Sequence, residues 1–305
     1  MDDISEASTV EDTNVEVDNI EKELAIFRKQ IDEIDNVIIS QLKKRIGIVK
    51  QVGSLKYSKT NIPCPIRPGR EAEMIRDITE RFAESDFPAA SAAAIWRIII
   101  GASTNVESKL TTSIFSDEKE SKLYWLAREY FGPNIPIIKQ PYVKRVISDV
   151  IEDKASVGIV PNMDNISDDD NWWVLLLQQG ENSPKIFAHI PFVNNQPTDR
   201  NNPSALAIAK LIPEPSGDDI SIIVIEAEHN VSQNRLQTIF SSIGLNARWL
   251  TTTTINPASR HHLIEVRCFV DENHEELKQA LSALGRALFR CYFLGAYATP
   301  IDFTN

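Results

Sequence analysis

The sequence has few cysteines: only Cys64, Cys268 and Cys291 occur in 305 residues. They are too few and too scattered for a disulfide framework or a zinc knuckle, so we expect a reduced, cytoplasmic compartment. No apolar run approaches the ~18 residues that a membrane helix needs, so we expect no membrane association. The first residues show no basic stretch followed by an apolar one, and we therefore expect no secretory signal.

The sequence also lacks an excess of positive charge. Its 32 Lys and Arg residues against 43 Asp and Glu residues give a net charge of −11. Nucleic-acid binding needs a basic footprint across a whole domain, so no nucleic-acid partner is expected. Residues 20–110 are the exception, because 15 bases face 12 acids there. This local balance fits a small anionic ligand.

Several motifs typical of cofactor binding, metal binding or nucleophilic catalysis are missing as well. The chain has no glycine-rich phosphate loop, no Ser-His-Asp set and no spacing typical of metal ligands. We therefore expect neither a cofactor nor a metal. The remaining composition, 42% hydrophobic and 25% charged, is that of an ordinary globular protein.

The N-terminal third begins with an acidic stretch and continues with an amphipathic pattern. Residues 1–19 hold seven acids and no base, which predicts a disordered acidic tail. From about residue 21 to 56, apolar residues recur every three or four positions, as in an amphipathic helix. These residues are Leu24, Phe27, Ile31, Ile34, Ile38, Leu42, Ile46 and Val49. A helix of ~35 residues would be ~50 Å long, so we expect a partner chain to cover its apolar side in a homodimer.

Two further helices follow this long one. Three prolines predict a loop between Thr60 and Gly69. The apolar pattern then predicts helices from Arg70 to about Pro88 and from Ala89 to about Leu110. Residues 20–112 should thus form an all-α domain with a long first helix and an intertwined dimer.

After residue 112, helical patterns alternate with short β-rich runs. Such runs occur at 135–138, 156–160, 186–190, 220–225, 247–250 and 262–270. The alternation predicts a multidomain chain with an α/β domain at 113–212 and a second one at 218–303. The stretches 191–203 and 213–219 read as polar linkers.

Charged residues along the first helix are spaced in a way that suggests a ligand site. Arg45 and Lys56 are 11 residues apart, which is three turns, so they share one face ~16 Å apart. Arg28 is 17 residues before Arg45, hence ~25 Å away and about 100° round the helix. Arg28 cannot reach the same small ligand within its own chain, but it can from an antiparallel second subunit.

Residues 20–110, with Arg28, Arg45 and Lys56 at these intervals, resemble the all-helical class of chorismate mutases. The intervals from Arg28 to Arg45 and on to Lys56 fit that family without a gap. Further matching positions are Asp35, Gly53, the Arg70-Glu71 pair, Ser103 and Glu107. Two positions depart from the pattern: Arg67 replaces an acid found in some members, and Glu107 stands where others have glutamine.

The resemblance implies the Claisen rearrangement of chorismate to prephenate, a unimolecular reaction that needs no nucleophile, metal or proton relay. It also implies the roles of the site residues. Arg45 and the second subunit's Arg28 would grip the two carboxylates, and Lys56 and Glu107 would face the ether oxygen. Glu71 would face the ring hydroxyl, with Ser103 and Arg70 completing the lining.

The rest of the chain resembles two other families more faintly. Ala155–Pro161 is similar to a strand and turn of prephenate dehydratases, but Asn162–Asn165 replaces their Glu-Asn-Ser, and Thr198–Leu206 lacks their Thr-Arg-aromatic motif. Residues 218–300 resemble an ACT regulatory domain, closed by Phe293–Tyr297, with Thr251–Thr254 in place of the Glu-Ser-Arg-Pro that binds amino acids. The resemblance implies a dehydratase-like domain without activity, followed by an ACT-like domain that serves either as scaffolding or in regulation.

Two alternatives to a simple mutase remain open. The first is a bifunctional chorismate mutase and prephenate dehydratase, which the missing Thr-Arg-aromatic motif disfavours. The second is a non-catalytic sensor that binds an aromatic metabolite through its C-terminal domains. Arg28, Arg45, Lys56, Glu71 and Glu107 are all in place, which argues against the sensor.

Overall fold

The computed structural model describes residues 5–59, 65–116, 122–163, 171–177, 183–194, 204–271 and 273–303, without the side chains of residues 5–18 and 57–59. Contacts divide the chain into two compact units, Met1–Leu55 and Lys56–Asn305.

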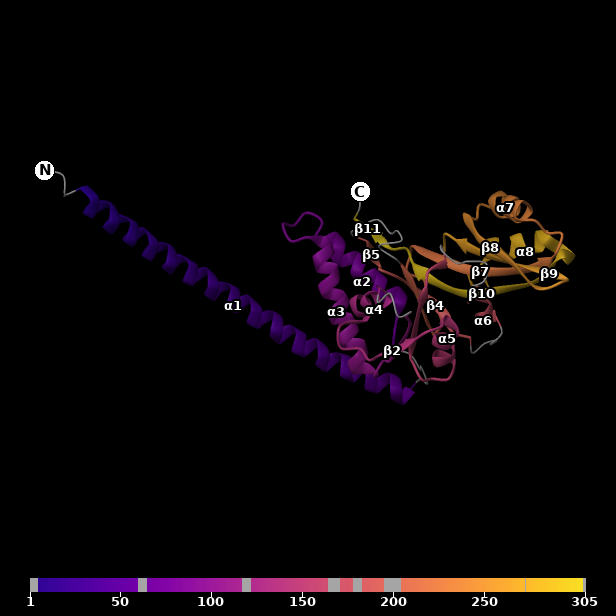
Figure 1. Cartoon of the computed structure of the whole chain (residues 1–305), viewed down its shortest axis with the longest axis horizontal. Coiled ribbons are helices and arrows are strands. Elements are labelled where there is room, and N and C mark those ends of the chain that lie inside the picture. The colour runs from indigo at the N-terminus through magenta and orange to yellow at the C-terminus, as the bar shows by residue number, and fades with distance from the viewer. Residues whose placement is uncertain are drawn as a thin grey trace. The chain divides into compact units, whose positions relative to one another are not determined.

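The first unit consists of most of the long helix α1, which runs from Ser5 to Lys59 (Figure 1). Of the stretch expected to be a disordered tail, residues 5–19 belong to this helix and contain no glycine or proline that would stop it, and residues 1–4 lie outside the described residues. The expected apolar side is present and bare. Phe27, Ile31 and Ile34 are 57%, 58% and 61% exposed. Such a long exposed apolar stripe is typical of a helix that packs against another chain.

Helices α2 (Pro68–Arg81) and α3 (Ala89–Glu107) confirm the second and third predicted helices. Proline lies in the first turn of α2 and at the N-cap of α3, where its missing N–H costs nothing. Small residues let α3 pack closely. Ala92 and Ala93 are almost fully buried, and a Cβ at Gly101 would overlap the Phe131 carbonyl at the end of α4 (Lys122–Phe131).

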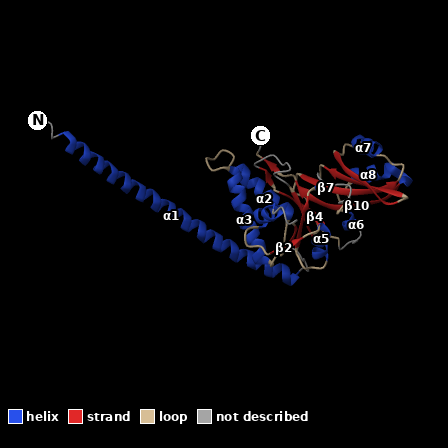
Figure 2. Ribbon diagram, in the orientation of Figure 1, coloured by secondary structure: helices blue, strands red, loops and turns tan. Residues whose placement is uncertain are grey.

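Most of the second unit is built on one sheet (Figure 2). In the described residues nine strands hydrogen-bond in the order β2-β1-β3-β6-β4-β10-β7-β9-β8. The strands are β1 (Thr112–Phe115), β2 (Ile137–Gln140), β3 (Val157–Pro161), β4 (Lys185–Ile190), β6 (Ala205–Ala209), β7 (Asp219–Glu228), β8 (Ala247–Asn256), β9 (Ser259–Val266) and β10 (Leu288–Ala298). Strands β1, β2 and β3 are parallel, and β7, β8, β9 and β10 form an antiparallel half.

Helices cover both halves of this sheet. Helix α5 (Val143–Ile151) buries Val146 and Val150 against the parallel half, close to the short α6 (Val174–Leu177). Helices α7 (Gln233–Ser242) and α8 (Glu275–Leu284) lie on one face of the antiparallel half, as Figure 2 shows. The 3₁₀ turn Gly285–Ala287 follows α8, and β11 (Ile301–Asp302) pairs with β5 (Val193–Asn194).

The two expected α/β domains share this sheet, and the join between them is narrow. Strand β10 pairs with β4 through a single register pair, Gly295 with Ile186. A Cβ at Gly295 would overlap the backbone of Ile186, and the φ angle of Gly295 is +145°. Only glycine tolerates both the close approach and this backbone conformation.

We expect Gly295→Ala to destabilise the second unit by at least ~2 kcal/mol, because the strands must separate or the backbone must strain. For a unit of this size the melting temperature should fall by about 5 °C or more. The matched control is Gly244→Ala, whose φ of +86° is also positive but which has open space around its Cβ position. Thermal unfolding of both variants separates the cost of the overlap from that of the backbone angle; equal melting temperatures would contradict the proposed close packing.

The segment 213–219, expected to be a polar linker, is fixed to α2 instead. Arg76 donates hydrogen bonds to the carbonyl oxygens of Ser216 (2.8 Å) and Asp218 (2.7 Å). Arg67 forms an ion pair with Glu214 at 2.8 Å, and the backbone of Gly69 lies against that of Pro215. The helix that carries Arg70 and Glu71 is therefore held by the chain that leads into β7.

Candidate functional site

Lys56 and Glu107, both predicted to face the same substrate atom, lie together in the second unit. Lys56 Nζ is 2.7 Å from Glu107 Oε1, although the two residues are 51 positions apart. Their side chains are 28% and 14% exposed, so the pair stands at the edge of the protein interior. A polar ligand can therefore reach both groups, and an anionic or ether oxygen can compete with Glu107 for the lysine N–H groups.

Glu71 has a partner that the sequence analysis did not identify. Arg97 Nη1 of α3 donates a hydrogen bond to Glu71 Oε2 at 2.8 Å, and both side chains are nearly buried. Burial raises the pKa of Glu71, while the Arg97 charge and hydrogen bonds from Arg97 and the Arg67 backbone act in the opposite direction. Arg97 was missed because a single charged residue on a helix usually lies at the surface.

The other predicted site residues differ in their surroundings. Ser103 is buried on α3 and donates a hydrogen bond to the Ile99 carbonyl at 2.6 Å. Arg70 is exposed in the first turn of α2. Arg28 and Arg45 belong to α1 in the first unit, with Arg28 exposed and Arg45 half-buried. The grouping of all seven residues around one ligand stays a prediction.

A second candidate site is a large cleft in the α/β part. A cavity of about 1020 Å³ lies outside the carboxyl ends of the parallel strands β1 to β3, where α/β sheets commonly bind ligands. Its lining includes Phe115, Lys144, Arg145, Asn162, Trp172 and Thr253. Lys144 and Arg145 lie in the first turn of α5, so their charges add to the positive end of that helix. The cleft suits an anionic ligand with an apolar body.

The dehydratase-like motif positions can be followed only in part. Asn162 lines the cleft and donates a hydrogen bond to Ser204 Oγ at 2.7 Å. The rest of its motif segment, from Asp164, and residues 198–203 of the expected Thr-Arg-aromatic segment lie outside the described residues. Among the described residues no group of His, Cys, Asp and Glu is arranged to hold a metal ion. None of the helices described is long and apolar enough to cross a membrane.

The last turn of α1 and helices α2 and α3 thus form an all-helical segment that carries two partly buried pairs of opposite charge, Lys56–Glu107 and Arg97–Glu71. Residues 27–108 match the family model of chorismate mutase type II. The match includes Lys56, Glu71, Arg97 and Glu107.

Comparisons with whole proteins extend further along the chain. Over 143 residues, 46% of this chain, the sequence is 31% identical to a bifunctional chorismate mutase/prephenate dehydratase of Aquifex aeolicus (strain VF5). The matched region spans only 39% of that relative's length. A solved prephenate dehydratase of Streptococcus mutans is 13% identical, with 63% of this chain and 99% of that one covered at a TM-score of 0.46. The quorum quenching acylase GqqA is 12% identical, with 62% and 95% covered at a TM-score of 0.48.

Proposed function

We propose that the protein is a chorismate mutase that rearranges chorismate to prephenate in phenylalanine and tyrosine biosynthesis, in the cytoplasm. The observation that carries this proposal is the 2.7 Å pairing of Lys56 with Glu107, inside a segment that matches the chorismate mutase type II family. The substrate is a dianion, which agrees with the positive balance of residues 20–110.

The site residues hold the substrate and stabilise the charge that develops on it, and none of them forms a covalent bond with it. Arg45 and the second subunit's Arg28 bind the two carboxylates and favour the compact conformer in which the new bond forms. Negative charge develops on the ether oxygen as its bond breaks, and Lys56 and a protonated Glu107 donate hydrogen bonds to it. Glu71 accepts a hydrogen bond from the ring hydroxyl, while Ser103 and Arg70 complete the polar lining.

This mechanism requires a homodimer. The apolar stripe of α1 is exposed along the described part of the first unit, with Ile34, Val37 and Ile38 each more than half exposed. A second copy of the same helix running antiparallel would cover the stripe. It would also bring its own Arg28 to the site that holds Arg45.

We expect the purified protein to convert chorismate to prephenate and to stop there. The reason is that Asn162 stands where the dehydratase pattern has a glutamate and that the Thr-Arg-aromatic motif is missing from the sequence. Loss of chorismate absorbance, with chromatography of the products at neutral pH, checks the result. An inactive protein contradicts the proposed function, and phenylpyruvate formed faster than prephenate decays by itself contradicts only the inactive second domain.

The second candidate, a bifunctional mutase and dehydratase, is favoured by the cleft of about 1020 Å³ beside α5. Lys144 and Arg145 there suit a carboxylate, and the Aquifex aeolicus relative carries both activities in its name. The same product analysis separates this candidate from the first. A sensor without catalysis would bind ligand in the cleft but leave chorismate unchanged.

A further inference from the structure

The Glu71–Arg97 pair also contacts residues outside the helical domain. Arg97 lies on the face of two aromatic rings, with its guanidinium carbon 4.2 Å from the Tyr130 ring centre and 5.6 Å from that of Phe192. Tyr130 belongs to α4, and Phe192 follows the end of β4, so both rings belong to the α/β part of the second unit. A guanidinium held between a carboxylate and aromatic faces has little freedom to turn.

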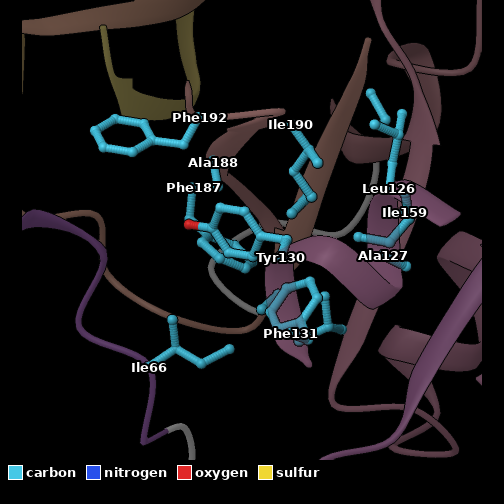
Figure 3. Close-up of a cluster of buried hydrophobic side chains, with 14 of the residues drawn as sticks. Ile66, Leu126, Ala127, Tyr130, Phe131, Ile159, Phe187, Ala188, Ile190 and Phe192 are labelled. Atoms are coloured by element: carbon cyan, nitrogen blue, oxygen red, sulfur yellow. The ribbon is translucent and has the colours of Figure 1, made fainter. Parts of the chain in front are cut away.

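The rings that hold Arg97 are themselves firmly packed. Tyr130 is 7% exposed, and its ring centre lies 4.8 Å from that of Phe131. Figure 3 shows Tyr130 and Phe131 in one cluster with Phe187 and Ile159 of the sheet. The position of Arg97, and with it that of Glu71, is therefore set by the core of the α/β part.

We propose that Arg97 is a positioning residue of the mutase site, which holds the Glu71 carboxylate toward the substrate and fixes it to the α/β core through Tyr130 and Phe192. This inference rests on the proposed function, because Glu71 is taken to face the ring hydroxyl of chorismate. It gives the α/β part a concrete role in catalysis even if that part carries no activity of its own. Arg97 itself need not touch the substrate.

The charged groups around Glu71 predict a pH dependence through which the positioning role of Arg97 can be measured. Burial raises the pKa of Glu71, and the charge of Arg97 is the largest of the effects that lower it, followed by the hydrogen bond from the Arg67 backbone. Tyr130 of α4 also faces the pair, and burial raises its pKa to about 12, so it stays neutral. Glu129 of α4 lines a small cavity beside Arg97 and has a pKa that burial raises too. Without Arg97, Glu71 should become protonated at higher pH and then accept the hydrogen bond from the ring hydroxyl less strongly, because a neutral carboxyl group is a weaker acceptor than a carboxylate.

The test compares kcat/KM from pH 5 to 9 for Arg97→Gln, Arg97→Lys and the double variant Glu71→Gln/Arg97→Gln. Relative to the wild type at the same pH, Arg97→Gln should lower kcat/KM by about 10- to 100-fold at acidic pH, since a misplaced group costs that much, and this ratio should recover toward higher pH. Arg97→Lys keeps the charge and should lose activity without this added acid dependence. The double variant should lose the acid dependence as well, because an amide does not titrate in this range.

Arg128→Gln is the matched control, because Arg128 also stacks on a ring of α4, that of Tyr124, at 5.1 Å. It should leave the shape of the pH profile unchanged. An equal loss for Arg97→Gln at every pH would overturn the proposal and indicate a purely structural residue.

Failure of the proposed function would look different. If the wild-type protein left chorismate unchanged, the mutase assignment would be wrong, and the Glu71–Arg97 coupling could still be judged. A ¹³C NMR titration of the glutamate carboxyls, with Glu71→Gln identifying the signal, reports Glu71 directly. Its midpoint should rise in Arg97→Gln, and an unchanged midpoint would overturn the coupling.

Discussion

Mixing Arg28→Ala chains with Arg45→Ala chains should restore activity that neither variant has alone. Each single variant loses a carboxylate ligand and should fall by ~10²–10³ in kcat/KM, the loss typical for one charge-stabilising group. In a mixed dimer one site receives Arg45 from the first chain and Arg28 from the second, and the other site lacks both. Random exchange of equal amounts should therefore restore about a quarter of the sites.

The matched control mixes wild-type chains with chains that carry both substitutions. Here each site of the mixed dimer lacks one arginine, so exchange should lower activity from about a half to about a quarter of the wild-type value. Activity that does not change on subunit exchange, in either experiment, would show that each chain builds its own site. Chains must be mixed under conditions where exchange is verified, for example by mass spectrometry of differently tagged subunits.

The second large effect is expected for Glu107→Gln, as a change in pH dependence. An ionised carboxylate only accepts hydrogen bonds, so Glu107 can donate to the ether oxygen only when protonated. Glu107 Oε1 lies 2.7 Å from Lys56 Nζ, so both groups are placed to face the same substrate oxygen. Wild-type kcat/KM should therefore fall with rising pH, by up to about tenfold per pH unit.

Glutamine donates a hydrogen bond at every pH and releases Lys56 from its ion pair. The kcat/KM of Glu107→Gln should therefore change little from pH 5 to 9 and exceed the wild-type value at alkaline pH. Glu73→Gln is the matched control, because it removes the same charge at an exposed position of α2. Parallel profiles of wild type and Glu107→Gln would mean that Glu107 is not the ether-oxygen donor.

Local patterns allowed much of the helical part to be predicted. The recurrence of apolar residues gave the continuous helix now seen as α1, and prolines marked the starts of α2 and α3. The family spacing also selected Lys56 and Glu107, which the structure brings within 2.7 Å. Such signals lie within a few turns of helix and so do not depend on the rest of the fold.

The α/β part was less predictable from local patterns. Strands β1 and β6 were missed, because β1 has four residues and β6 reads Ala-Leu-Ala-Ile-Ala, in which alanine favours helix. Burial on both faces makes β6 a strand in the middle of the sheet. Helix α8 ends at Leu284, because Gly285 adopts a φ of +57° there.

The helices of residues 20–110, the charged positions along them and the resemblance to chorismate mutases could all be recognised from local patterns in the sequence. The pairing of Glu71 with Arg97, the stacking of Arg97 on Tyr130 and Phe192, and the sheet that joins both α/β halves at Gly295 could be found only in the folded chain. These contacts connect residues distant in sequence, and their partners are selected by burial and close packing, which no local pattern of residues encodes.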